Sequence, residues 1–242
     1  MKTNKKNFYL KKIDQRGHIE VWLVDGKKVR RDVNEEFTNF GQHFHFPFIP
    51  ENEFWLDNEA TSNEQNFFID HLLVERKLMK NGVPYLEALE KANKKEAVER
   101  ARAGDLKIIK TNSDEIILNK IHKQFLEIAD KKIFIWLVDA RLVRSVFDLN
   151  FTEGGHDFVY NYIPSSEVWL DDDIFPNERP FVLLHELFER QLMAEQTLVY
   201  SEAHKLASQL EWKARHNKKN LEEVLFNLGL NIEQLETICL LS

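Results

Sequence analysis

The apolar positions of the chain follow two different spacings, and the change between them predicts the order of its elements. Between residues 179 and 193, apolar side chains recur at the spacing of an amphipathic helix, and Pro180 suits the first turn of that helix. A second helix is predicted over residues 199–215. Upstream, the short apolar runs "FIWLV" and "EVWLD" predict strands. Strands followed by a pair of helices are typical of the α+β class.

The N-terminal half of the chain shows the same succession. It contains "VWLV", then "EFWLD", then "FFIDHLLVERKLM", which corresponds to "FVLLHELFERQLM" in the C-terminal half. After the first of these runs, Asp25-Gly26 predicts a hairpin turn. Two further pairs of extended stretches are predicted over residues 37–48 and 151–162, each divided by glycine.

The two halves align in a single register, which identifies an internal duplication. An offset of 114 residues holds without a gap from Val21 to Met79, and an offset of 115 continues the match to Glu96. Chance matching does not keep one register over so long a span. The matched pairs include Trp22 with Trp136, Pro50 with Pro164, Asp57 with Asp171, His71 with His185, Glu75 with Glu189 and Arg76 with Arg190.

We therefore predict an α+β fold formed by tandem duplication, in which each copy is a small antiparallel sheet followed by a helical hairpin. Residues 1–106 are assigned to the N-terminal copy and residues 130–216 to the C-terminal copy. Between them, residues 107–129 are predicted to form a helical connector because "EIILNKIHKQFLEIA" has helical character. Residues 217–242 are predicted to form an amphipathic helical tail.

Composition and charge exclude several classes of function. The chain has 242 residues and a formal net charge of −7, and its Lys and Arg residues are dispersed, which argues against a general binder of nucleic acid or membrane surfaces. No apolar run approaches the length of a membrane span. Cys239 is the single cysteine, which excludes an internal disulfide framework and a cysteine-based zinc site. We expect a cytoplasmic protein.

The stretch "FVLLHELFERQLM" places three ionisable side chains in an otherwise apolar helix. His185 and Glu189 lie four residues apart and therefore share one face, at a spacing suited to holding one cation. In zinc metallopeptidases the His-Glu-x-x-His helix supplies two ligands and a general base. Glu189 stands here at the second ligand position, and a carboxylate oxygen is also a zinc ligand.

A third ligand is expected from the following helix. His204 lies there between two small residues, Ala203 and Ala207, which allow close approach to the first helix. If the two helices pack antiparallel, His185, Glu189 and His204 form a three-ligand zinc site with water in the fourth position. Glu186 is then the candidate general base that takes a proton from this water.

Other residues are candidates for supporting roles. Glu211 or Asp171 is expected to orient a ligand imidazole, and Tyr200 to stabilise an oxyanion. His156 follows two glycines in "FTEGGH", so it is a further metal ligand, a substrate contact or an ordinary polar residue of a loop.

"HELFER" with a downstream "AH" resembles the metal-binding helix of the zincin metallopeptidases. Its arrangement of candidate ligands is similar to that of the gluzincins. The resemblance covers residues 168–211, and "EVWLD" precedes the helix where that family places the strand beside its substrate cleft. It implies a zinc peptidase with a peptide or protein substrate. The ligand types are exchanged, since Glu189 stands where His is usual and His204 where Glu is usual. A "HEL-x-ER…AH" pattern is also similar to that of uncharacterised bacterial and phage proteins.

The N-terminal copy has lost part of this set. It keeps His71 and Glu75, but Leu72, Leu89 and Gln42 stand at the positions of Glu186, His204 and His156. We therefore expect the N-terminal copy to be metal-free.

An alternative gives the shared His/Glu pairs a structural role, with Asp57 and Asp171 as their partners. The protein is then a non-catalytic interaction module. On this alternative, the Phe-rich segment "FGQHFHFPFIP" of the N-terminal copy contacts a protein partner.

Overall fold

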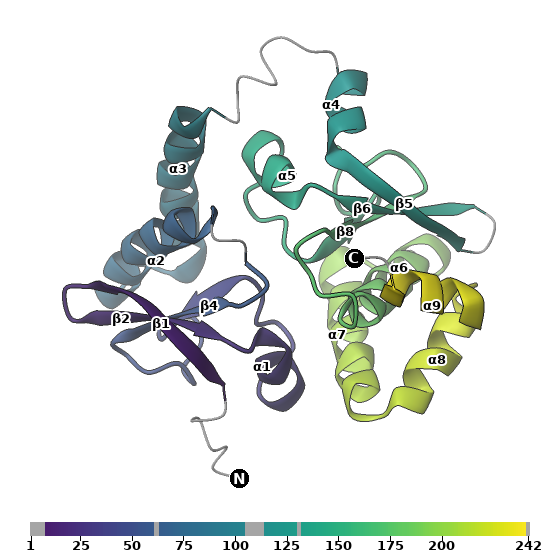
Figure 1. The fold of residues 1–242 in the computed structure, drawn as a ribbon, viewed down its shortest axis with the longest axis horizontal. Coiled ribbons are helices and arrows are strands. Elements are labelled where there is room, and N and C mark those ends of the chain that lie inside the picture. Colours follow the sequence, from purple (N-terminus) through teal and green to yellow (C-terminus); the bar gives the residue numbers. More distant parts are fainter. Residues whose placement is uncertain (1–7, 61–62, 105–113, 130–131, 241–242) are drawn as a thin grey trace. The chain divides into compact units, whose positions relative to one another are not determined.

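The computed structural model describes residues 8–60, 63–104, 114–129 and 132–240. The chain divides into two compact units, Met1–Thr111 and Asn112–Ser242 (Figure 1). Each unit has a four-stranded sheet followed by helices, and further helices end the second unit. The predicted α+β class and tandem duplication are therefore confirmed. None of the helices in the described ranges combines the length and apolar character needed to cross a bilayer.

The sheet of the N-terminal unit has the strand order β1-β2-β4-β3 and is mixed rather than antiparallel. Its central strands β2 and β4 run parallel, whereas β1 and β3 are antiparallel edge strands. The prediction of a purely antiparallel sheet is wrong because α1 and β3 lie between the central strands in sequence and reverse the chain twice. The elements are β1 (Tyr9–Arg16), β2 (Ile19–Val24), α1 (Gly26–Asp32), β3 (Phe40–Gln42), β4 (Glu53–Asp57), α2 (Gln65–Lys80) and α3 (Tyr85–Ala103).

The C-terminal unit repeats this arrangement, with strand order β5-β6-β8-β7 and β6 parallel to β8. The same tryptophans face each other across the central pair, Trp22 opposite Trp55 and Trp136 opposite Trp169. The elements are α4 (Asp114–Ile121), β5 (His122–Ala129), β6 (Ile133–Val138), α5 (Ala140–Val146), β7 (Gly154–His156), β8 (Glu167–Asp171), α6 (Arg179–Glu195), α7 (Tyr200–His216), α8 (Lys218–Asn227) and α9 (Ile232–Leu240). Helices α8 and α9 form the predicted helical tail.

The predicted helical connector is helical only in part. Residues 107–113 lie outside the described residues, and α4 follows them, but residues 122–129 form strand β5. In β5, Leu126 is buried and Phe125 is exposed, and the strand pairs antiparallel with β6. Pairing with a neighbouring strand therefore overrides the local helical pattern.

The predicted hairpin at Asp25-Gly26 is instead the start of helix α1. The side chain of Asp25 accepts a hydrogen bond from the backbone N–H of Lys28 at 3.1 Å, which is the geometry of a helix N-cap. Asp139 caps α5 in the same way through Leu142. The extended pairs predicted over residues 37–48 and 151–162 are likewise reduced to the short strands β3 and β7.

Helix α6 is the centre of packing in the C-terminal unit. It contacts β7 and β8 of the sheet, α7 along its length, and α8 and α9 of the tail. Its side chains Leu183, Leu184 and Leu187 are buried in the main apolar core together with Val168 and Leu170 of β8. Burial on three sides fixes the orientation of α6, and with it the direction of its ionisable side chains.

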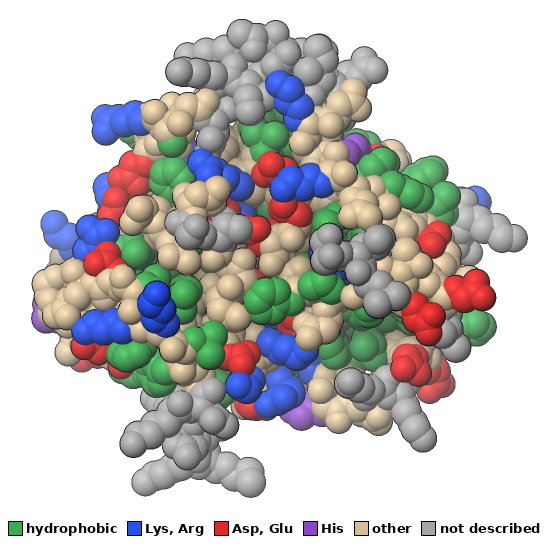
Figure 2. All heavy atoms as spheres, in the orientation of Figure 1, with side chains coloured by type: hydrophobic (Ala, Val, Ile, Leu, Met, Phe, Trp, Pro, Cys, Tyr) green, Lys and Arg blue, Asp and Glu red, His purple; other side chains and the backbone are tan. Residues whose placement is uncertain are grey.

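Charged residues of both signs are interspersed on the face of the molecule that Figure 2 shows. This distribution agrees with the dispersed Lys and Arg residues of the sequence.

Candidate metal centre

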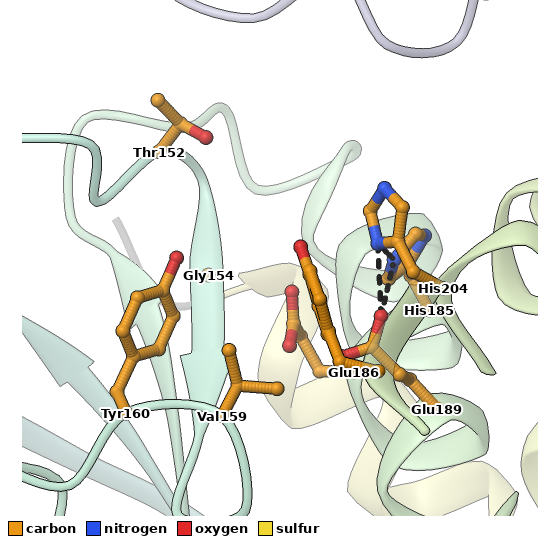
Figure 3. Close-up of a pocket in the computed structure, with 9 residues that line it drawn as sticks. Thr152, Gly154, Val159, Tyr160, His185, Glu186, Glu189 and His204 are labelled. Carbon is orange, nitrogen blue, oxygen red and sulfur yellow. Dashed lines mark hydrogen bonds and ion pairs between the residues drawn. The ribbon is translucent and has the colours of Figure 1, made fainter. Parts of the chain in front are cut away.

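Three side chains from α6 and α7 converge on one point in the C-terminal unit (Figure 3). The distances are 3.1 Å from His185 Nε2 to His204 Nδ1, 2.8 Å from His204 Nδ1 to Glu189 Oε2, and 3.5 Å from His185 Nε2 to Glu189 Oε2. Two ligand atoms of a tetrahedral zinc ion lie about 3.4 Å apart, as bond lengths of about 2.0–2.1 Å require. The structure therefore brings the three predicted ligands together at close to zinc spacing.

Small residues on α7 make this convergence possible. Ala203 and Ala207 are both fully buried against α6, so the two helix backbones approach each other closely. His204 lies between them in sequence and reaches back to His185 and Glu189 on α6.

Glu211 fixes the ring of His185 from the side opposite the convergence point. Its Oε2 hydrogen-bonds to His185 Nδ1 at 2.9 Å, which leaves Nε2 directed at His204 and Glu189. Arg215 in turn donates to Glu211 Oε1 at 2.8 Å. Burial alone would raise the pKa of Glu211, but the charge of Arg215 and the hydrogen bond to His185 lower it. Glu211 therefore has the predicted orienting position.

His156 contacts the carboxylate of Glu189 and not the convergence point. It is fully buried, and its Nε2 lies 3.0 Å from Glu189 Oε1, the oxygen that faces away from His185. Its Nδ1 accepts the backbone N–H of Phe158 at 3.2 Å. In a neutral imidazole the proton therefore resides on Nε2, which donates to Glu189 and is not available to a metal. His156 thus holds one oxygen of Glu189 while the other faces the two histidines.

The hydrogen bonds around Glu189 decide its charge. Burial by itself would raise the pKa of this carboxyl, but hydrogen bonds from His156, His185 and His204 lower it well below its usual range. Glu189 is therefore ionised, as a metal ligand must be. His185 responds in the opposite direction: burial would lower its pKa, but the nearby carboxylate of Glu189 and the hydrogen bond to Glu211 raise it well above the usual value.

Glu186 differs from its neighbours because its carboxylate makes no hydrogen bond to any described residue. One of its oxygens lies within 4.8 Å of Glu189 and of a ring nitrogen of His156. Burial raises the pKa of Glu186, although the charges of His185 and His156 oppose this shift. A carboxylate with a raised pKa and unfilled acceptor positions is suited to take a proton.

Glu186 faces a small polar pocket of about 80 Å³, which has room for several water molecules. Gly154 on β7 leaves this space open, because a Cβ there would lie 2.9 Å from Val182 and 3.1 Å from Glu186. The residues that line the pocket are Thr152, Gly154, Val159, Tyr160, His185, Glu186, Glu189, Tyr200 and His204.

Four of these residues, Thr152, Gly154, Val159 and Tyr160, were not singled out as site residues in the sequence. Gly154 begins β7, and the other three lie in the segments on either side of it. Comparison of the two copies points to Gly154 and Tyr160, which stand where the N-terminal copy has Phe40 and Phe46.

Tyr200 also lines the pocket, with its ring centre 5.3 Å from that of His204. Asp171 does not join the site. Its carboxylate accepts a hydrogen bond from Arg144 at 2.8 Å, and Asp57 pairs with Arg30 in the same way. Of the two residues predicted to orient an imidazole, Asp171 instead lies at the end of β8 facing α5, and Glu211 is the one that contacts His185.

The N-terminal unit contains a related but closed arrangement. His71 Nδ1 lies 2.8 Å from Glu96, His71 Nε2 lies 3.6 Å from Glu75, and Gln42 donates to Glu75 at 2.8 Å. The ring of Phe40 lies 5.2 Å from that of His71.

The Phe-rich segment, expected in the alternative hypothesis to contact a partner, packs within its own unit. Phe46 is buried beside Phe37 and Trp55, and Phe48 is partly buried against the same cluster.

Comparisons with known proteins give no assignment, since no protein-family model, curated protein or solved structure matches the chain.

Proposed function

We propose that the C-terminal unit is a zinc-dependent hydrolase that acts on peptides or proteins, with His185, Glu189 and His204 as the metal ligands. The observation that carries the proposal is the convergence of three ligand atoms within 3.5 Å of one another. The donor set fits zinc, because two imidazoles and one carboxylate with a position left for water are typical of catalytic zinc sites. Glu211 and His156 hold two of the ligands in the required orientation.

A zinc ion bound here supplies a Lewis acid that lowers the pKa of a water molecule toward neutrality. Glu186 then acts as the general base, since its unbonded carboxylate faces the same pocket and burial raises its pKa. Glu189 and His156 have other roles, because both are already committed to hydrogen bonds with each other. This division gives each of the buried ionisable groups a separate task.

The lining of the pocket supports an uncharged acyl group as the reacting group. None of the described residues that line it is Lys or Arg. Phosphate esters carry negative charge and are usually held by Arg, Lys or metal clusters. An amide carbonyl needs no such cation. The resemblance to zincins, which implies a peptidase, points the same way.

Metal content tests this proposal most directly. The purified chain, reconstituted with zinc and dialysed, is expected to hold about one zinc ion, and His204→Leu is expected to hold none. Leucine is the residue of the N-terminal copy at this position, so the helix tolerates it. His216→Leu is the matched control, because His216 is exposed on the same helix and bonds only to the backbone of Trp212 among the described residues. A wild-type chain without zinc overturns the proposal.

A second measurement separates binding from catalysis. Glu186→Gln is expected to keep the zinc ion but to lose turnover of a peptide-library substrate, because an amide takes no proton from water. Retention of the wild-type rate removes Glu186 from the mechanism.

The alternative is a non-catalytic interaction module that binds a protein partner through the N-terminal copy. One observation favours it. In the N-terminal unit, His71 contacts Glu75 and Glu96 although Phe40 stands where Gly154 opens the pocket of the C-terminal unit. Such contacts can serve structure alone. This alternative predicts no zinc and a partner whose binding is unaffected by Glu186→Gln. For either function we propose the cytoplasm, since one exposed free cysteine suits a reducing compartment.

A further inference from the structure

Tyr160 in the C-terminal unit and Phe46 in the N-terminal unit occupy equivalent positions. Their rings pack in the same way, but only Tyr160 carries a hydroxyl group. The ring of Tyr160 lies against Gly155, where a Cβ would approach the ring to 2.6 Å. The ring of Phe46 lies against Gly41 with the same 2.6 Å separation. Both rings also pack on a phenylalanine, Tyr160 on Phe151 and Phe46 on Phe37. Packing therefore requires the ring alone, and the N-terminal unit shows that the fold forms without the hydroxyl.

The hydroxyl of Tyr160 belongs to the pocket beside Glu186. Tyr160 lines that pocket, and Figure 3 shows its ring on the strand side with the oxygen directed toward the open space. The oxygen makes no hydrogen bond to any described residue. Its donor position is therefore open to a molecule bound in the pocket. Burial, and next the charge of Glu186, raise the pKa of Tyr160, so the phenol keeps its proton and remains a donor.

We propose that Tyr160, rather than Tyr200, is the residue that donates a hydrogen bond to the carbonyl oxygen of the substrate. The proposal rests on the proposed hydrolase function. Both tyrosines line the pocket, but Tyr200 is 46% exposed and its ring lies beside that of His204, whereas Tyr160 comes from the sheet side of the pocket, where its ring is held by Gly155 and Phe151.

The hydroxyl acts where charge develops during the reaction. As the water oxygen bonds to the carbonyl carbon, its proton passes to Glu186 and the C=O π pair moves onto the carbonyl oxygen. The O–H of Tyr160 stabilises that oxygen. The C=O bond then re-forms, the bond to the leaving nitrogen breaks, and Glu186 returns the proton to that nitrogen. A donor fixed in advance at this point costs no reorganisation during the reaction.

Tyr160→Phe tests the assignment, with Tyr162→Phe as the matched control. Phenylalanine is the residue of the N-terminal copy at both positions. Tyr162 is not among the pocket residues and stacks on Phe147 at 4.9 Å, and its ring lies 5.2 Å from that of Tyr160, so this variant controls for the loss of a neighbouring hydroxyl that does not line the pocket. Zinc content is measured first. Acetohydroxamate, which presents a carbonyl oxygen, is then titrated into the cobalt-substituted full chain and followed by its visible spectrum.

The expected result is a normal metal content and an acetohydroxamate Kd raised about fivefold to tenfold in Tyr160→Phe, as loss of one neutral hydrogen bond predicts. Hydrolysis of p-nitrophenyl acetate is expected to fall about 100-fold in kcat with little change in KM, because the bond is strongest in the transition state. Tyr162→Phe is expected to match wild type in both.

The possible failures are distinguishable. A wild-type chain that takes up no metal overturns the proposed function and the Tyr160 assignment together. A metal-loaded chain in which Tyr160→Phe binds acetohydroxamate within twofold of wild type overturns the Tyr160 assignment alone. Preference of the metal-loaded chain for p-nitrophenyl phosphate over p-nitrophenyl acetate overturns the carbonyl as the group that Tyr160 contacts.

Discussion

Each unit contains the same buried network of histidine, glutamate and arginine side chains, but the residues around this network differ between the units. In each unit a glutamate of the second helix holds a histidine of the first, Glu96 with His71 and Glu211 with His185, both at 2.8–2.9 Å. An arginine four residues further on, Arg100 or Arg215, pairs with that glutamate. The repetition of these contacts in both units shows that the fold itself uses them.

Three differences between the units lie around the pocket. The N-terminal unit has Phe40 where Gly154 opens the space, Leu72 where Glu186 faces it, and Leu89 where His204 completes the proposed metal site. The strand register is identical on both sides, since Phe40 faces Leu56 as Gly154 faces Leu170. A buried His/Glu pair is therefore part of the scaffold. The open pocket, the third ligand and the unbonded carboxylate distinguish a site from that scaffold.

The largest effect is expected from breaking the shared scaffold. Arg100→Met leaves Glu64 and Glu96 buried without the cation that pairs with both, and Arg215→Met does the same to Glu178 and Glu211. Each change is expected to lower the free energy of unfolding of its unit by about 3–5 kcal/mol, as loss of one partner of a buried pair does. Hydrogen exchange of the amides in α2 and α6 measures each unit separately.

Arg102→Met is the control for this comparison, since Arg102 is exposed on the same helix as Arg100. It is expected to change stability by less than about 0.5 kcal/mol. Equal losses at Arg100 and Arg215 support a common structural role, whereas a loss confined to Arg215 shows that the network serves only the C-terminal site.

The second prediction builds the missing ligand into the N-terminal unit. His71 Nε2 and Glu75 Oε2 already lie 3.6 Å apart, close to the 3.5 Å of His185 and Glu189. Leu89→His is therefore expected to raise the zinc content from about one to about two ions per chain. Free zinc at 100 times its Kd is expected to stabilise that unit by about 3 kcal/mol. Zinc analysis by mass spectrometry and hydrogen exchange of α2 measure the two effects.

Leu86→His is the control for this gain, since Leu86 is exposed on the same helix. Unchanged zinc content in Leu89→His shows that the N-terminal scaffold is too closed to admit a metal, with Phe40 as the next position to change.

The third prediction concerns the pH dependence of the stability of the N-terminal unit. Burial alone would lower the pKa of His71, but the nearby carboxylate of Glu75 and the hydrogen bond to Glu96 raise it to about 9. A folded-state pKa above the unfolded value of about 6.5 means that the protonated form is stabilised by folding. This contribution, up to about 3 kcal/mol, is fully present below about pH 6.5 and is lost as the pH rises through about 9.

Hydrogen exchange of α2 between pH 6 and pH 10, corrected for intrinsic exchange, measures this loss. His71→Gln is expected to remove the pH dependence. A wild-type profile that stays flat over this range contradicts the assignment of a protonated His71.

The sequence alone predicts the contacts that are local along the chain and misses those between distant segments. The repeat offset and the helical spacing predict the helix pairs and the convergence of His185, Glu189 and His204, because these depend on contacts along one helix and between two successive helices. The bond from His156 to Glu189 spans 33 residues and depends on where β7 lies in the sheet. Strand β5 and the parallel pairing of β2 with β4 are missed for the same reason, because the local sequence of a short strand does not specify which strand it pairs with.

The smallest effect on stability, and the most informative for function, is expected from Glu186→Leu. This change gives α6 the residue that Leu72 provides in α2, where the side chain is buried. Burial raises the pKa of Glu186, so the ionised carboxylate is disfavoured in the folded state and its removal is expected to stabilise the C-terminal unit by about 1 kcal/mol or less. Zinc content is expected to stay at about one ion per chain while hydrolysis is lost. A functional group kept at a cost to stability is typical of an active site.

Chemical denaturation of Glu186→Leu, with Glu186→Gln measured in parallel, tests this expectation. A clear loss of stability would instead assign Glu186 to the scaffold that the two units share.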